Sequence, residues 1–197
     1  MTQIYEQLAD LLDYPAPGWE ANVAVCQKLV RRTMPELRSS FATFSDEVKD
    51  LSLATLQEIY TRTFDLSPVC ALEIGYHLFG ENYKRGVFLA NLRETEASFN
   101  LGQEHQLPDY LPVLLRLLTK LDDKELRDSL IVDCMIPALE KMLKTLSGAD
   151  NPYQHLIMAA RSLLNSEDRT YPATVHRAQL PVLQNAAIST ETKTVLL

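Results

Sequence analysis

Apolar residues recur at intervals of three and four positions along most of the chain, from Ile4 to Leu164. This spacing puts them on one face of successive α-helices, whereas strands would show strict alternation. Proline and glycine residues divide the pattern into segments, because proline stops a helix and glycine favours helix ends. The pattern predicts helices over about 4–12, 20–32, 35–48, 53–64, 69–79, 83–101, 109–118, 124–132, 137–148 and 152–165.

Local residue types also predict how several of these helices begin and end. Ser52 can accept a hydrogen bond from a backbone N–H of the helix that follows it. Pro112 has no N–H to donate and must lie in the first turn of its helix. This puts the helix start near Asp109, whose carboxylate is a candidate cap. Gly80 can end the fifth helix, because glycine tolerates the left-handed conformation common at helix ends.

Together these elements predict an all-α fold, a single helical bundle of about nine to ten helices. The pattern contains no convincing strand, internal repeat or glycine-rich loop. We expect the domain to cover residues 1–166. From residue 167 onward the periodicity fades, so residues 167–197 are predicted to form a mostly disordered, flexible C-terminal tail. The short apolar piece at 178–183 could still dock onto the bundle.

The charge of the chain restricts its partners. The 197 residues carry a net charge of −7, with a pI of about 5.1. Nucleic acid is therefore not expected as a partner, because phosphate binding requires a concentrated basic surface. A basic peptide would be a natural partner through charge complementarity. The alternative is that the negative charge only keeps the protein soluble.

The N-terminal sequence and the cysteines point to the cytoplasm. Residues 1–19 lack the basic start and the apolar stretch of a signal peptide, and no apolar run is long enough to cross a membrane. Cys26, Cys70 and Cys134 form no CxxC pair, and their odd number and wide spacing do not suggest a disulfide framework. We expect buried free thiols in a cytoplasmic protein without membrane insertion.

The chain carries no arrangement typical of a catalytic or metal site. The four histidines are scattered, and the sequence contains no HExxH, no paired ExxH units, no CxxC and no phosphate-binding loop. Glu73 and His77 would share a helix face, but one such pair favours a local salt bridge or hydrogen bond over a metal site. We therefore expect a protein that is not an enzyme and needs no metal, haem or nucleotide cofactor.

Several short motifs follow one another in a fixed order through the middle of the chain. They lie in YTRTFDLSPVCALEIGYHLFGENYKRGVFLANL (60–92) and LPDYLPVLLRLL (107–118). A tyrosine and Phe-Asp close one helix, a histidine and a glycine end the next, and Arg-Gly opens another before the Leu-Pro-Asp segment. Over residues 53–165 this order resembles the nitrate reductase delta-subunit family, the NarJ-type molybdenum cofactor assembly chaperones. The chain departs from the family pattern at Tyr110, where a histidine is usual.

The resemblance implies an all-helical cytoplasmic chaperone. Such a protein would bind the apo catalytic subunit of respiratory nitrate reductase and assist molybdenum cofactor insertion and assembly of the complex. Its handle would be the client's N-terminal segment, a basic amphipathic peptide that enters a groove between helices. Two alternatives stay open: a chaperone for another molybdoenzyme, of the S- or N-oxide reductase type, and a helical-bundle enzyme.

The resemblance also implies where such a peptide would bind. Its motifs concentrate before the helix that starts near Asp109 and around the break at 65–70, and loops at helix ends are frequent binding sites. Structural roles compete with this interpretation, because Tyr60 and Phe64 lie on an apolar stripe typical of the core. The candidate peptide-binding residues are Tyr60, Phe64, Asp65, His77, Arg85, Leu107, Pro108, Asp109 and Tyr110.

Overall fold

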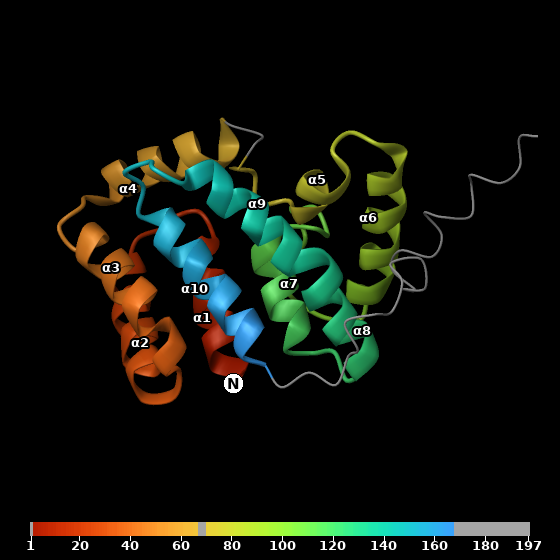
Figure 1. Ribbon diagram of the computed structural model, residues 1–197, viewed down its shortest axis with the longest axis horizontal. Helices are drawn as coiled ribbons and strands as arrows, with labels where there is room; N and C mark the ends of the chain where they lie inside the picture. Colours follow the sequence, from red (N-terminus) through yellow and green to blue (C-terminus); the bar gives the residue numbers. More distant parts are fainter. Residues whose placement is uncertain (1, 67–69, 168–197) are drawn as a thin grey trace, which may run out of the picture.

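The computed structural model describes residues 2–66 and 70–167 (Figure 1). Within these residues every regular element is a helix, which confirms the predicted all-α fold. Most of the predicted tail, from residue 168 on, lies outside the described residues. The elements are α1 (Thr2–Leu12), α2 (Trp19–Thr33), the 3-10 helix η1 (Pro35–Leu37), α3 (Arg38–Val48), α4 (Leu53–Tyr60), the π-helix η2 (Thr61–Asp65), α5 (Ile74–Phe79), α6 (Tyr83–Glu96), α7 (Leu111–Leu118), α8 (Lys124–Ser129), the π-helix η4 (Leu130–Met135), α9 (Ile136–Leu146) and α10 (Tyr153–Ser166).

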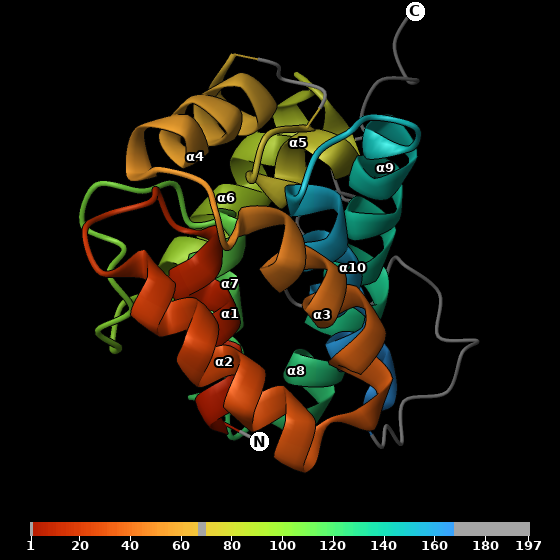
Figure 2. The same ribbon diagram turned by 90° about the vertical axis from the view of Figure 1, so that its left-hand side faces the viewer.

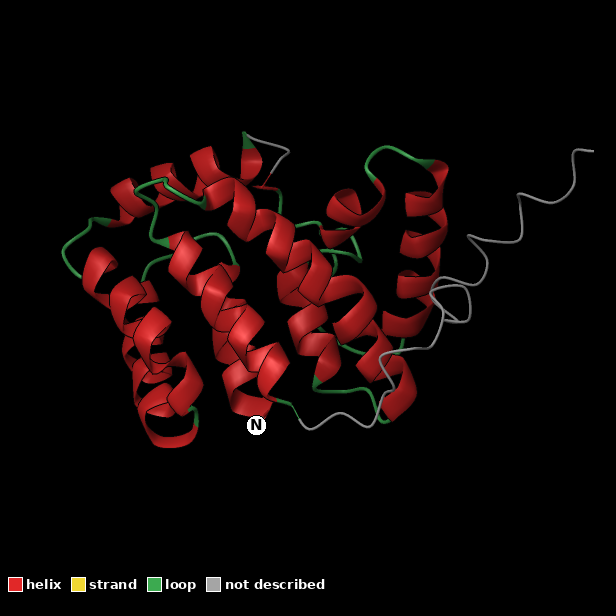
Figure 3. Cartoon of the chain, viewed as in Figure 1, coloured by secondary structure: helices red, strands yellow, loops and turns green. Residues whose placement is uncertain are grey.

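Helices α1, α7 and α10 form the centre of the bundle. α1 packs against α7 and α2, and α10 packs against α9 and α3. Figure 1 shows α2 and α3 on one side of this centre and α5 and α6 on the other. In Figure 2, as in Figure 1, α4 and α5 lie at the same end of the bundle. Figure 3 shows the loops that connect the helices of the bundle.

Helix α7 is buried on nearly all sides. Every one of its residues except Arg116 is buried, as expected for a helix whose sequence, LPVLLRLL, is apolar all round. The guanidinium of Arg116 forms ion pairs with Glu6 and Asp10 in α1 and with Asp13 directly after it. Apart from Arg116, whose side chain forms these ion pairs, the central helix α7 is therefore apolar and buried.

Residue types that act within one helical turn correctly predicted one helix start and one helix end. The Ser52 hydroxyl accepts a hydrogen bond from the Thr55 N–H at 3.1 Å, which confirms the predicted cap. Gly80 ends α5 with a φ of +59°, also as predicted. Two helices are five residues shorter than predicted, since α5 begins at Ile74 and not at 69, and α6 ends at Glu96 and not at 101.

The late start of α5 has a tertiary cause. The N–H of Leu111 donates to the carbonyl of Leu72 at 2.9 Å, and the N–H of Ile74 donates to the carbonyl of Asp109 at 2.9 Å. The backbone before α5 therefore pairs with the loop before α7. Backbone N–H and C=O groups that bond between the two segments cannot form hydrogen bonds within a helix. Helix α5 therefore starts only where this pairing ends.

The three cysteines are buried as thiols outside any disulfide, as predicted. Burial raises the pKa of Cys26 to about 12 and that of Cys70 to about 11. Both remain protonated at neutral pH and are poor nucleophiles, because the thiolate is the reactive form. In the described part of the chain, no helix has the length and apolar character needed to cross a membrane.

Glu96 is a buried carboxylate whose oxygens find no hydrogen-bond partner among the described residues, although Arg93 lies 3.8 Å away. Burial raises the pKa of Glu96 above its ordinary 4.5. The unfolded chain therefore releases this proton more readily than the folded one, and stability falls as pH rises above about 4.5. We expect Glu96→Gln to raise the melting temperature by a few degrees at neutral pH and to match the wild type below that pH.

Thermal denaturation across this pH range, followed by circular dichroism, measures the effect. Glu94→Gln, which removes an exposed carboxylate from the same helix, should melt like the wild type throughout. A melting-temperature difference for Glu96→Gln that does not change with pH would contradict the buried charge as its cause.

Candidate functional site

A cavity of about 460 Å³ opens where η2, α6, the start of α5 and the loop before α7 meet. We call it the η2–α5 cavity. Its volume lies in the range typical of ligand pockets. Most of the candidate residues lie on it, together with residues around the start of α5. Its lining consists of Tyr60, Phe64, Asp65, Ala71, Leu72, Glu73, Tyr76, Arg85, Leu107 and Tyr110.

Aromatic rings form the floor of the η2–α5 cavity. Tyr60 and Phe64 are buried, which confirms their predicted place in the core, and their ring centroids lie 5.0 Å apart. The Tyr60 ring also packs on Tyr153 in α10, at 5.6 Å. The Tyr60 hydroxyl donates to the carbonyl of Leu12 at 3.1 Å and lies 3.0 Å from the Tyr110 hydroxyl. The two residues are therefore core and cavity floor at once, and their contacts hold the floor in place.

Tyr110 joins the loop before α7 to this floor. Burial raises the pKa of Tyr110, and the nearby carboxylate of Asp13 raises it further. The phenol therefore stays protonated and uncharged at neutral pH. It contributes an aromatic surface and a hydroxyl rather than a group that changes charge.

Asp109 does not cap α7, contrary to the prediction. The cap position of α7 belongs to Tyr110, whose side chain makes no capping hydrogen bond. Asp109 is fully buried, and its Oδ2 accepts a hydrogen bond from the N–H of Gly75, in the first turn of α5, at 3.0 Å. Its backbone carbonyl accepts the N–H of Ile74. The residue caps a different helix, because its loop pairs with the chain before α5.

Arg85 connects this buried carboxylate to the cavity. One guanidinium nitrogen lies 3.3 Å from Asp109 Oδ2, and the guanidinium carbon lies 5.9 Å from the centroid of the Tyr76 ring. Burial raises the pKa of Asp109, while the charge of Arg85 lowers it. Since Arg85 is already paired with Asp109, the two carboxylates of the lining, Asp65 and Glu73, leave the rim with surplus negative charge.

Glu73 shows what kind of ligand this rim favours. Burial raises the pKa of Glu73 above 4.5, and the carboxylates of Asp109 and Asp65 raise it further, partly offset by Arg85. A cationic group bound in the cavity would lower this pKa again, because an opposite charge favours the ionised form. The lining is therefore better suited to a basic ligand than to an acidic one.

Besides Asp109, two further candidate residues, His77 and Pro108, lie outside the lining of the cavity. His77 is buried, and its Nε2 lies 2.7 Å from the carbonyl of Ala71, rather than pairing with Glu73 as the spacing suggested. Burial lowers the pKa of His77, so the ring is neutral at pH 7 and donates this hydrogen bond. Lys141 in α9 donates to the backbone carbonyl of His77. Pro108 is buried in the loop before α7. These residues hold the lining in position.

Gly75 and Tyr76 are site residues that the sequence analysis missed. A Cβ at position 75 would lie 2.5 Å from Asp109 Oδ2 and 3.1 Å from Phe88 Cδ1, so a larger residue would push Asp109 away. Tyr76 forms the cavity wall beside Arg85. Both lie within the 60–92 segment, but their importance comes from contacts with other segments, which local spacing does not reveal.

The lining of the η2–α5 cavity has the character of a binding surface. Among the described residues, it includes no serine, cysteine, lysine or histidine. In the part of the chain that the structure describes, no group of His, Cys, Asp and Glu side chains could hold a metal ion. The cavity combines an aromatic floor, an acidic rim and the exposed Leu107 side chain. This combination suits a peptide that carries both apolar and basic residues.

Comparison with known proteins points to one family. Residues 27–164 match the family model described as nitrate reductase delta subunit, and this range includes the whole lining of the η2–α5 cavity. The chain is also 27% identical over 164 residues to the probable nitrate reductase molybdenum cofactor assembly chaperone NarJ of Bacillus subtilis (strain 168). That alignment covers 79% of this chain and 86% of the relative.

Proposed function

Because the chain belongs to the nitrate reductase delta subunit family, we propose that it is an assembly chaperone for respiratory nitrate reductase. In this role it binds the apo catalytic subunit in the cytoplasm and assists molybdenum cofactor insertion and assembly of the complex. The name of the similar Bacillus subtilis protein supports this assignment. The protein then acts by binding and releasing its client, not by catalysing a reaction.

The observation that carries the proposal is the aromatic floor of the η2–α5 cavity beneath its acidic rim. The ligand is the N-terminal segment of the catalytic subunit, a basic amphipathic peptide. An apolar side chain of this segment packs on Tyr60 and Phe64, next to Leu107, which lines the cavity and is 43% exposed. A basic side chain lies against Asp65 and Glu73. Rim charges mainly set the rate of association, and the buried apolar contact sets the rate of dissociation.

Truncating Leu107 tests this proposal. We expect Leu107→Ala to weaken binding of a synthetic client peptide roughly fivefold to tenfold, because a leucine buried on binding loses about 1 kcal/mol or more of apolar contact. Isothermal titration calorimetry measures the affinity. Val25→Ala is a matched control, since Val25 is 41% exposed but lies on α2, away from the cavity.

The charge of the rim gives a second measurement on the same system. Wild-type affinity should fall as salt rises, because exposed charges are screened beyond about 10 Å at 0.1 M salt. Asp65→Asn should weaken binding at low salt and reduce this dependence. Equal affinities for wild type, Leu107→Ala and Asp65→Asn would contradict peptide binding in this cavity. Tighter binding of the corresponding peptide from an S- or N-oxide reductase would reassign the client.

A further inference from the structure

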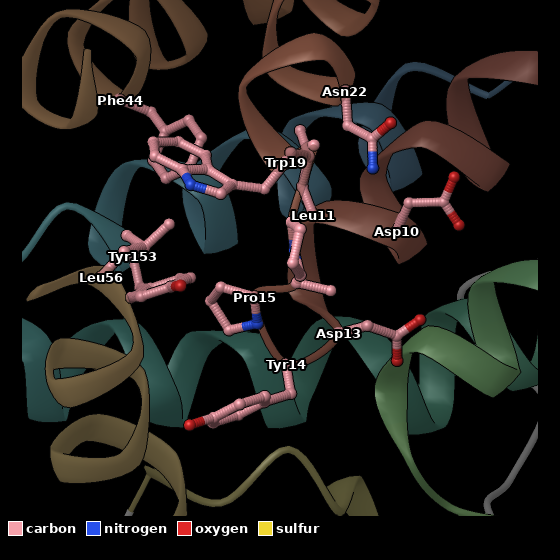
Figure 4. Close-up of a pocket in the computed structure, with 13 residues that line it drawn as sticks. Asp10, Leu11, Asp13, Tyr14, Pro15, Trp19, Asn22, Phe44, Leu56 and Tyr153 are labelled. Atoms are coloured by element: carbon pink, nitrogen blue, oxygen red, sulfur yellow. The ribbon is translucent and has the colours of Figure 1, made fainter. Parts of the chain in front are cut away.

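A second cavity, of about 280 Å³, lies where the turn between α1 and α2 meets α3, α4 and α10. We call it the α1–α2 cavity. Figure 4 shows Pro15, Trp19 and Tyr153 around it, with the carboxylates of Asp10 and Asp13 to one side. The client-binding proposal makes no use of this cavity. Its lining residues from α1 and the start of α2 also precede the residues that match the family model.

Trp19, which lines the α1–α2 cavity, carries an unpartnered hydrogen-bond donor on its buried ring. The residue is only 6% exposed, and its Nε1–H has no hydrogen-bond partner among the residues that the structure describes. Figure 4 shows the indole nitrogen on the edge of the ring that faces Tyr153. A buried N–H without an acceptor is unfavourable, and indole can only donate. The occupant that fits must therefore bring an acceptor, such as a peptide carbonyl.

Three carboxylates face a single guanidinium beside this cavity. Arg116 lies 2.9 Å from Asp10 and 2.5 Å from Asp13, and Glu6 lies 3.8 Å from the same guanidinium. Asp10 and Asp13 line the cavity and remain partly exposed. One positive charge does not neutralise three negative ones. The cavity therefore favours an occupant with a cationic group.

A single contact between two tyrosine rings separates the two cavities. Tyr14 lines the α1–α2 cavity, and its ring centroid lies 5.3 Å from that of Tyr60, which lines the η2–α5 cavity. Tyr153, on the α1–α2 side, also contacts Tyr60. The Tyr14 ring is half exposed, so a bound chain can pass over it. An extended chain advances roughly 3.3 Å per residue, so the 5.3 Å between the Tyr14 and Tyr60 rings corresponds to about two residues.

We propose that the α1–α2 cavity is a second subsite for the same client peptide, and that it binds a basic residue together with a neighbouring backbone carbonyl. The proposal rests on the proposed function, because the η2–α5 cavity anchors the other part of the peptide. The carbonyl accepts the Trp19 N–H, and the basic group lies against Asp10 and Asp13. The faces of Tyr14 and Trp19 add attraction for a cation. One segment that fills both cavities gains affinity, because its second contact is intramolecular.

Trp19 is the only tryptophan of the chain, so its fluorescence reports on this cavity. The probe is a synthetic peptide of the client's N-terminal segment in which phenylalanine replaces any tryptophan, titrated into the full-length protein. We expect Trp19 emission to change with the same midpoint as the heat measured by calorimetry. Unchanged emission while calorimetry registers binding would overturn this proposal and leave the proposed function standing.

Two variants remove the two recognition elements separately. Trp19→Phe keeps an aromatic ring and removes the donor, so we expect affinity to fall roughly threefold to tenfold. Its melting temperature should not fall through a lost hydrogen bond, because this N–H has no partner among the described residues. Asp10→Asn should weaken binding at low salt and less at high salt. Glu20→Gln, next to Trp19 but outside the cavity lining, is the matched charge control and should bind like the wild type.

The outcomes separate this proposal from the one on which it rests. Wild-type affinity in Trp19→Phe and Asp10→Asn, together with weakened binding in Leu107→Ala, would restrict the peptide to the η2–α5 cavity. Absence of any binding by the wild type would overturn the proposed function and the subsite together. A response of Trp19 to a synthetic peptide of residues 168–197, but not to the client peptide, would assign the cavity to this chain's own C-terminal segment and overturn the proposal.

Discussion

Replacing Asp109 with alanine is expected to lower the free energy of unfolding by about 3 kcal/mol and to abolish peptide binding in the η2–α5 cavity. The carboxylate is fully buried and accepts hydrogen bonds from the Gly75 N–H and the Arg85 guanidinium. Alanine would leave both donors without their acceptor. A partly buried cation such as Arg85, 23% exposed, is destabilising when it loses its partner, because its desolvation is no longer compensated.

Peptide binding would fail because Asp109 positions the cavity lining. The residue joins the loop before α7 to the first turn of α5, and it holds Arg85 against the cavity wall. Asp109→Asn separates charge from hydrogen bonding, since an amide oxygen can still accept the Gly75 N–H. We expect this variant to lose less stability, about 1–2 kcal/mol, and to retain part of the affinity.

Urea denaturation followed by circular dichroism gives the stabilities, and calorimetry with the client peptide gives the affinities. Asp46→Ala is the control, because Asp46 is an exposed carboxylate that pairs with Lys49 across one turn at 3.6 Å. Such surface pairs contribute about 0–1 kcal/mol. If Asp109→Ala lost no more stability than Asp46→Ala, its capping of α5 would not contribute to stability.

A second large effect is expected at Glu167, where alanine should lower the free energy of unfolding by about 2–4 kcal/mol. The side chain of Glu167 is only 4% exposed, and it accepts hydrogen bonds from the Tyr5 hydroxyl and from both terminal nitrogens of Arg127. These bonds fasten the end of α10 to α1 and α8. The hydrogen bond to Glu167 is also the main factor that raises the pKa of Arg127. Alanine would leave a charged and largely buried guanidinium without a carboxylate.

Thermal denaturation compares Glu167→Ala with Glu58→Ala. Glu58 is well exposed and pairs with Arg62 at 3.9 Å, so its loss should cost little. Equal melting temperatures for the two variants would contradict the anchoring role of Glu167.

The same experiment tests whether the folded domain includes residue 167. The loss of periodicity put residue 167 in the predicted tail, but periodicity carries no information about a single buried contact beyond the last turn of a helix.

The sequence was informative wherever the deciding interactions lie within one helical turn. Apolar spacing located the helices, and the caps at Ser52 and Gly80 follow from hydrogen bonds and backbone conformation close to those residues. The burial of Tyr60 and Phe64 follows from their place on an apolar stripe. The order of motifs also singled out residues that line one cavity, although their spacing alone did not predict that they would meet.

The sequence by itself thus determined the helices, their buried faces and the segments that deserve a binding hypothesis. Only the tertiary structure decided which polar groups pair. Asp109 was predicted to cap its own helix, but it bonds to Gly75, 34 positions away. Asp10 and Asp13 meet Arg116 across more than half of the chain, and this meeting makes the α1–α2 cavity acidic. The physical reason is the distance along the sequence over which each kind of interaction acts. Periodicity and capping act within a turn, whereas a buried polar group bonds to whichever partner the packing of distant helices brings beside it.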